Sequence, residues 1–357
     1  MTLAKFEYRD IIRKNKSEGK VRYPECIKKG DIIAVTAPSM GFYKKEQIKE
    51  YENAIQNLKK MGFGFLETDN VRTDEQGRSS SAKERAKQFM QVWKDENVAS
   101  IICAKGGDFA CEMLDYLDFD TLKNTKPKWI QGFSDIGNLG FVFTTNLDIA
   151  TIYSENIRDY GMKEPFENLM NSIKIMQGEE VIQKSFGACE PMEDEREIFE
   201  SYHLTKKTEW KNLYDEPEVH FSGRCVGGSF DVMMNLIGTK YDKVKEYIEK
   251  YKNDGIVWFW DVYERSTPQL FCDLWQCKNA GYFEHCKGVI FGRPCIIRED
   301  YGKSFSDVIK EAIGNLKIPI ILEADIGHIP PQMPIVNGSI LEITCQNGKG
   351  EIRTFFK

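Results

Sequence analysis

Apolar and polar positions follow two different periods along the first 160 residues. The segment DIIAVTAPS (31–39) is a short apolar run that ends in turn-forming residues, as a buried strand does. The next segment, EQIKEYENAIQNLKKMG (46–62), places apolar residues three and four positions apart, which is the pattern of one helix face. The alternation continues with a helix at 81–96, a strand at 98–107, a helix at 108–117, a strand at 126–133 and a helix at 134–146. We therefore predict a parallel sheet with helices on both faces, that is, a flavodoxin-like α/β domain.

The regular alternation is lost between 166 and 218. This segment is rich in charged residues and poor in aliphatic ones, and we interpret it as a linker or lid. Beyond it the pattern predicts strands at 255–262, 288–294 and 318–327, a helix at 269–281, and a hairpin at 338–356 whose turn contains glycine. We expect an N-terminal α/β domain over 1–165, the linker or lid over 166–218, and a mixed α/β domain rich in short strands over 219–357.

Length, charge and cysteine usage narrow the class of protein. A chain of 357 residues exceeds what a single core usually supports, which agrees with two domains. The net charge of −6 argues against a nucleic-acid or membrane-surface partner, and no apolar run approaches the ~20 residues of a membrane-spanning helix. The first twenty residues lack the apolar stretch of a signal peptide, so we expect a cytoplasmic protein whose ten cysteines are reduced. With four histidines and no CxxC motif, we expect neither a metal site nor a cofactor.

The segment WIQGFSDIGNL (129–139) changes from strand-like to helix-like at Ser134. A serine at such a turn lies at the carboxyl edge of the sheet, and the amides that follow it begin a helix, which favours negative charge. This is the setting of a nucleophile elbow, although Ile136 stands where the GxSxG form has its second glycine. An ordinary N-cap serine would produce the same tetrapeptide.

Two other loops carry residues suited to the same chemistry. Gly106 and Gly107 follow a buried strand in AKGGDFACEML, where the backbone can turn sharply or approach a ligand closely. His328 follows a strand and a glycine and precedes a rigid proline pair, so it can be held in place and still be reached as a general base. Glycines end many strands, and a single loop histidine is often structural.

Six segments together resemble one protein family. They are GDIIAVTAPS, KGGDFACEMLDYLDFD, KWIQGFSDIGNL, GGSFDVMMNLIGT, GVIFGRP and GHIPPQMPIVNG, and in order and spacing they resemble the LD-carboxypeptidase family of serine peptidases. That family includes murein tetrapeptide carboxypeptidases and the self-immunity peptidases that inactivate microcin C. The resemblance spans about residues 28–345, and the long middle segment with its tryptophan is more similar to the microcin-immunity branch.

The resemblance implies a catalytic triad of serine, histidine and an acid. Ser134 matches the nucleophile and His328 the base. Asp261 stands at the end of the strand GIVWFWD, where the family has glutamate, and Glu264 is an alternative acid. The triad order along the chain, serine before acid before histidine, also occurs in unrelated hydrolases.

The resemblance also implies the surroundings of the triad. The backbone amides of Gly107 and Asp135 would form the oxyanion hole, without a metal or cofactor. Two departures from the family affect the site. Asp261 is one methylene shorter than glutamate, and residues 153–155 (YSE) stand where the family has a small Gly-Pro element, so the pocket should be narrower or differently charged.

Two substrate classes remain open. A murein peptidase would bind an LD-peptide and would need a cation for its carboxylate, for which Arg293 is a candidate. An immunity-type enzyme would bind an aminoacyl-nucleotide and would need an aromatic platform for the base, for which Trp210 is a candidate. Gly106 would contact either substrate, and the charged segment near 185–218 should close over Ser134 as a lid. The resemblance implies a homodimer, and the alternative function is a binding protein of the same fold with weak catalysis.

Overall fold

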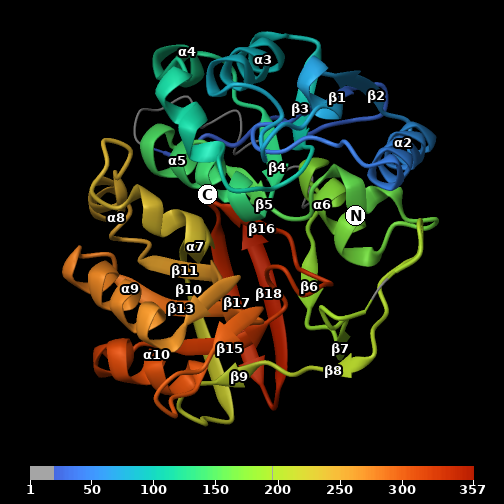
Figure 1. Cartoon of the computed structure of the whole chain (residues 1–357). Coiled ribbons are helices and arrows are strands. Elements are labelled where there is room, and N and C mark those ends of the chain that lie inside the picture. The colour runs from blue at the N-terminus through green and yellow to red at the C-terminus, as the bar shows by residue number, and fades with distance from the viewer. Residues whose placement is uncertain (1–19, 195) are drawn as a thin grey trace.

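The computed structural model describes residues 20–194 and 196–357. Residues 1–19, on which the expectation about a signal peptide largely depends, lie outside the described part of the chain. The described residues form one sheet of six strands, one of eight strands, and two short two-stranded ladders. Figure 1 shows the two large sheets one above the other, each accompanied by helices. The predicted fold class, a parallel-sheet α/β part followed by a mixed α/β part, is confirmed.

The first sheet has the strand order β16-β5-β4-β3-β1-β2. Its strands are β1 (Ile32–Thr36), β2 (Gly64–Glu67), β3 (Val98–Cys103), β4 (Trp129–Gly132), β5 (Thr151–Tyr153) and β16 (Ile335–Asn337). The first five are parallel to one another, whereas β16, which comes from near the end of the chain, pairs antiparallel with β5. The near-complete burial of β1, β3 and β4 explains why these strands read as continuous apolar runs.

Helices connect the strands of this sheet largely as predicted. They are α2 (Lys45–Lys60), α3 (Ala82–Lys94), α4 (Phe119–Asn124) and α5 (Gly137–Leu147). The start of α3 is fixed by Ser81, whose hydroxyl accepts a hydrogen bond from the backbone amide of Glu84. The helix predicted at 108–117 is a 3-10 helix, Ala110–Tyr116. Because α5 is buried along most of its length, its sequence is apolar on nearly all sides.

The second sheet has the strand order β6-β18-β17-β10-β11-β13-β15-β9. Its central strands are parallel: β10 (Glu218–Ser229), β11 (Ile256–Asp261), β13 (Cys286–Gly292) and β15 (Ile320–Ala324). The predicted hairpin is formed by β17 (Ile340–Gln346) and β18 (Lys349–Phe355), and β17 pairs antiparallel with β10. Figure 1 shows α8 (Val244–Lys250), α9 (Thr267–Asn279) and α10 (Phe305–Ile313) on one side of this sheet. The short helix α7 (Phe230–Met233) follows β10, and β12 (Glu264–Ser266) pairs with β14 (Ile296–Arg298).

The middle segment contains more secondary structure than its composition indicates. It includes α6 (Glu167–Met176), the edge strands β6 (Ile182–Lys184) and β9 (Lys211–Asn212) of the second sheet, and the ladder of β7 (Ala188–Cys189) with β8 (Lys206–Lys207). The composition of 166–218 did not indicate these helices and strands, and the interpretation of this segment as a linker or lid stays a prediction. Strands of two or three residues are too short to show a readable period, and they are held by their partners rather than by their own sequence.

The carboxyl ends of the two sets of parallel strands meet. Loops after β3, β4 and β5 of the first sheet and loops after β10, β11 and β15 of the second line one common pocket. This agrees with the rule that ligands bind outside the carboxyl ends of parallel strands. Within the described residues, no helix combines the length and the apolar character needed to cross a membrane.

Candidate active site

Ser134 occupies the turn between β4 and α5. Its backbone φ of 63° lies in the left-handed region, which a residue other than glycine seldom adopts. A 3-10 turn, Ser134–Ile136, leads directly into α5. Gly106 packs against the serine, because a Cβ atom at that position would lie 2.8 Å from the Cβ of Ser134. The hydroxyl is thus presented on a strained strand-to-helix turn whose neighbour must be small.

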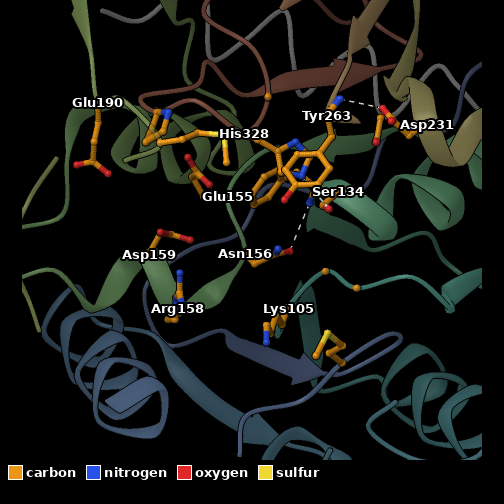
Figure 2. Close-up of a pocket in the computed structure, with 18 of the residues that line it drawn as sticks. Lys105, Ser134, Glu155, Asn156, Arg158, Asp159, Glu190, Asp231, Tyr263 and His328 are labelled. Carbon is orange, nitrogen blue, oxygen red and sulfur yellow. Dashed lines mark hydrogen bonds between the residues drawn. The ribbon is translucent and has the colours of Figure 1, made fainter. Parts of the chain in front are cut away.

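His328 and Asp261 continue a chain of contacts that starts at Ser134. His328 follows β15, and its Nε2 lies 2.9 Å from Ser134 Oγ (Figure 2). Its Nδ1 lies 2.8 Å from Oδ2 of Asp261, the last residue of β11, although the ring N–H does not point directly at that oxygen. The aspartate is fully buried, and the imidazole contacts the rings of Phe133 and Tyr263.

A close backbone approach compensates for the shorter acid. Gly327 has a φ of 96° and lies directly against Asp261, so a Cβ atom at 327 would overlap the carboxylate. The histidine loop therefore comes near enough for an aspartate to reach the imidazole. Glu264, the alternative acid, is exposed on β12, and the structure does not bring it to His328.

Two opposing influences set the charge state of His328. Burial lowers the pKa of the imidazole, whereas the negative charge of Asp261 and the contact with it raise this pKa, and Asp231 raises it further. The net result is a pKa above the ordinary value of 6.5. An imidazole with a raised pKa accepts a proton more readily.

The Asp135 side chain ties the serine turn to the glycine loop. Its Oδ2 accepts hydrogen bonds from Ser39 Oγ (2.5 Å) and from the backbone amide of Ala110 (2.7 Å). Gly106 also lies close to the serine turn, since a Cβ on it would lie 3.6 Å from the Asp135 amide nitrogen. Within the described chain, the amides of Gly107 and Asp135 make no hydrogen bond. Both are available to a ligand.

Ser134 lines a pocket of about 540 Å³. Its walls come from the loops of the first sheet, from the region around Asp231, Tyr263 and His328, and from part of the middle segment, namely Glu190, Pro191, Met192, Asp194, Arg196 and Tyr202. The middle segment therefore covers part of the pocket, as expected of a lid. Its movement stays a prediction.

The pocket wall carries charges of both signs (Figure 2). Lys105 and Arg158 provide cationic groups, and Glu155, Asp159 and Glu190 provide carboxyl groups. Burial lowers the pKa of Lys105, and the charge of Arg158 lowers it further. Burial also raises the pKa of Glu155, with a smaller contribution from Asp159. Among the described side chains, no three histidines, cysteines, aspartates or glutamates are grouped so that they could hold a metal ion.

Arg293 and Trp210 do not line this pocket, so the substrate-binding roles expected of them are wrong. Arg293 is 2% exposed, and its guanidinium pairs with Asp325 and donates to two backbone carbonyls of the histidine loop. Trp210 is also 2% exposed, and its Nε1 donates a hydrogen bond to Asp325 Oδ2 (2.7 Å). Both side chains are instead internal supports of the loop that carries His328.

Two residues of the site were missed by sequence reasoning. Lys105 directly precedes the glycine pair and lines the pocket. Its position at the end of a buried strand could have indicated this, because ligands bind at such strand ends. The sequence predicts for Tyr153 only that, together with residues 154 and 155, it makes the pocket narrower or differently charged. Its hydroxyl instead donates a hydrogen bond to Asp261 Oδ2 (2.6 Å), a contact between two strands that no local pattern indicates.

Two family models match the chain. The model of the LD-carboxypeptidase N-terminal domain matches residues 33–154, and that of the LD-carboxypeptidase C-terminal domain matches residues 222–343. Among characterised sequences, the microcin C7 self-immunity protein MccF of Escherichia coli is 23% identical over 308 residues, which cover 82% of this chain and 85% of that protein.

Solved structures share the fold. Wild-type MccF without ligand matches with a TM-score of 0.77 at 20% identity, covering 93% of this chain and 98% of that chain. A muramoyltetrapeptide carboxypeptidase from Oxalobacter formigenes matches with a TM-score of 0.70 at 18% identity, covering 91% and 99%. The two family models together span more than half of the sequence and contain every residue of the Ser134–His328–Asp261 contact chain. The chain therefore belongs to the LD-carboxypeptidase family of serine peptidases.

Proposed function

We propose that this protein is a cytoplasmic carboxypeptidase that hydrolyses an amide bond near the C-terminus of a small peptide or aminoacyl-nucleotide. The observation that carries the proposal is the contact chain from Ser134 Oγ to His328 Nε2 and from His328 Nδ1 to Asp261. A serine on a strained turn, with a base in reach and an acid behind the base, is the arrangement that activates a hydroxyl as a nucleophile.

The chemistry begins at Ser134. His328 Nε2 accepts the hydroxyl proton while Oγ attacks the carbonyl carbon, and Asp261 stabilises the imidazolium that forms. The amides of Gly107 and Asp135 would bind the oxyanion, and such donors each contribute roughly 3 kcal/mol to transition-state stabilisation. His328 then gives its proton to the leaving nitrogen as the C–N bond breaks. Water, activated by the same histidine, hydrolyses the acyl-enzyme and restores the serine hydroxyl.

The position of Lys105 favours a substrate whose leaving group carries a negative charge. A carboxypeptidase needs a cation for the terminal carboxylate, and Lys105 lies in the pocket beside the glycine pair with Arg158 close enough to influence its charge. The carboxylate of an LD-peptide and the acyl-sulfamate of an aminoacyl-nucleotide analogue are both anionic. The names of relatives include both classes, a muramoyltetrapeptide carboxypeptidase and an MccF complex with aspartyl sulfamoyl adenosine.

Cleavage of two defined compounds tests the proposal. The purified chain is incubated with an LD-tetrapeptide that ends in D-alanine and with aspartyl sulfamoyl adenosine, and products are identified by mass spectrometry. We expect cleavage of at least one compound, with loss of cleavage in Ser134→Ala and His328→Ala but not in the exposed-site control Ser222→Ala. Lys105→Met should raise KM for the cleaved compound with little change in kcat.

Serine labelling distinguishes the enzyme from a binding protein of the same fold. A fluorophosphonate should label the parent chain at Ser134 and should fail to label His328→Ala, because the hydroxyl then lacks its base. No labelling of the parent chain and no cleavage of either compound would favour the binding protein. Cleavage that survives Ser134→Ala would show that a different group is the nucleophile.

A further inference from the structure

The hydroxyl of Tyr153 contacts two parts of the proposed triad. Tyr153 ends β5 and is 1% exposed. Its hydroxyl donates a hydrogen bond to Asp261 Oδ2 (2.6 Å) and accepts one from the backbone amide of Ser134 (3.3 Å). The same carboxylate oxygen lies 2.8 Å from His328 Nδ1. One phenol therefore connects the serine turn, the end of β5 and the end of β11.

The tyrosine ring is held independently of its hydroxyl. It packs against Phe133 and Phe259, with ring centroids 6.2 Å and 5.5 Å apart. Backbone also lies close to it, because a Cβ at Gly137 or Gly228 would be 3.4 Å or 3.6 Å from a ring carbon. A phenylalanine ring would keep these contacts, so Tyr153→Phe removes the two hydrogen bonds without opening a cavity.

We propose that Tyr153 is a positioning residue that fixes the Asp261 carboxylate and acts through it on His328; this inference depends on the proposed function. Asp261 is fully buried, and its Oδ1 has no hydrogen-bond partner among the described residues. The Tyr153 hydroxyl thus donates a well-aligned hydrogen bond to Oδ2, and this bond determines that Oδ2 is the carboxylate oxygen that faces the imidazole. This hydrogen bond suits an aspartate, because its side chain has fewer rotatable bonds than that of glutamate and its carboxylate must be placed correctly by its neighbours.

The phenol also modulates the charge of the carboxylate. A donated hydrogen bond stabilises the negative charge on Oδ2 and weakens its influence on the neighbouring ring. Asp261 makes the largest contribution that raises the pKa of His328 against the effect of burial, and Asp231 adds a smaller one. Removing the phenol hydroxyl should therefore raise the pKa of His328 further. The neutral, catalytically competent imidazole would then form only at higher pH.

Kinetics of Tyr153→Phe test the inference. We expect kcat to fall about tenfold, which corresponds to a loss of about 1.4 kcal/mol in transition-state stabilisation. KM should stay nearly constant, because Tyr153 does not line the pocket. The acidic limb of the kcat/KM profile should move to higher pH. In an Asp261→Asn background, Tyr153→Phe should cause little further loss, since both changes then affect the same carboxylate.

Tyr247→Phe is the matched control. Tyr247 is buried, and its hydroxyl has no hydrogen-bond partner within the described chain, so its loss should change neither kcat nor the pH profile. Parent-like kcat and an unshifted acidic limb in Tyr153→Phe would overturn the inference. A lower Tm with an unshifted limb would show only a structural role and would also overturn it. Absence of Ser134-dependent activity in the parent would instead overturn the proposed function, before Tyr153 is tested.

Discussion

Gly327 has no room for a side chain, and this lets the histidine loop approach Asp261. We predict that Gly327→Ala lowers kcat by about a hundredfold, because displacement of a catalytic group by roughly 1 Å has an effect of that size. The added Cβ would overlap the carboxylate, and alanine is strained at a φ of 96°. Steady-state kinetics measure kcat, and urea unfolding should show a destabilisation of about 1–3 kcal/mol.

A substitution at a second glycine, Gly30, distinguishes the effect of backbone strain from the effect of overlap with the Asp261 carboxylate. Gly30 has a φ of 93°, and no atom would lie within 4 Å of an added Cβ. Gly30→Ala should therefore reduce stability through strain alone and leave kcat unchanged. If Gly327→Ala retained the parent kcat, the reaction would not depend on the present contact between Asp261 and His328.

Asp261 is already at the correct distance from His328, so a glutamate should not improve the site. Oδ2 lies 2.8 Å from the imidazole nitrogen, and a further methylene would push the carboxylate into Gly327 or Tyr153. We predict that Asp261→Glu lowers kcat by about tenfold or more and destabilises the fold by roughly 1–3 kcal/mol through overpacking. Restored or increased kcat in Asp261→Glu would show that the loop adapts freely to a longer acid.

At the residue scale, the sequence located groups whose position follows from their own strand. Ser134 follows an apolar strand of the first sheet and His328 an apolar strand of the second, and ligands bind at the carboxyl ends of such parallel strands. The roles expected of Arg293 and Trp210 were wrong because both side chains bind Asp325, a buried residue that directly follows β15. The sequence around Arg293 and Trp210 predicts exposed side chains, because their buried partner Asp325 is distant in the sequence.

The loop between β15 and β16 depends on a buried support. Arg293 pairs with Asp325 and donates to the carbonyls of Ile329 and Pro331, on both sides of the loop that follows His328. We predict that Arg293→Met destabilises the protein by about 3–5 kcal/mol, because Asp325 would remain buried without its counter-charge. In the folded fraction kcat should fall, and KM should not rise, because Arg293 does not line the pocket.

An exposed arginine provides the comparison for this change. Arg298 on β14 has a side chain that is 74% exposed, so Arg298→Met should leave both unfolding and kinetics nearly unchanged. Thermal unfolding and steady-state kinetics of the two variants are measured side by side. If Arg293→Met raised KM without loss of stability, Arg293 would bind the substrate and would not be a support of the loop.

At the scale of elements, long periodic segments were predictable and short bridging ones were not. The helices α2 and α3, the strands β1 and β11, and the C-terminal hairpin follow the predicted ranges closely. The apolar pattern indicated neither strand β5, which has only three residues, nor helix α6, which lies at the start of a segment whose charged remainder dominated its composition. Their positions are set by pairing and packing with distant elements rather than by local pattern.

At the scale of the whole molecule, the site exists only where the two sheets meet. The serine turn belongs to the first sheet, whereas the acid and the histidine follow strands of the second. The chain also links the sheets by its path: β16, which follows the histidine loop, returns to the first sheet and pairs with β5. Tyr153 lies on β5 at this junction and contacts Asp261 of β11. Correct placement of the sheets therefore positions the three residues of the proposed triad as a unit.

The buried carboxyl of Glu155 should make the stability of the whole molecule depend on pH. Burial, and then the charge of Asp159, raises the pKa of Glu155 above its ordinary 4.5, so the folded protein retains a proton that the unfolded chain releases. The contribution of this group to stability is therefore complete below about pH 4.5 and is lost as the pH rises through the folded-state pKa. We predict that Glu155→Gln, which cannot ionise, gains stability relative to the parent as the pH rises over this range, in urea unfolding at successive pH values. Glu193→Gln, at an exposed position, is the control for the removal of a carboxyl group. A constant stability difference between Glu155→Gln and the parent across the range would show that Glu155 titrates alike in the folded and unfolded states.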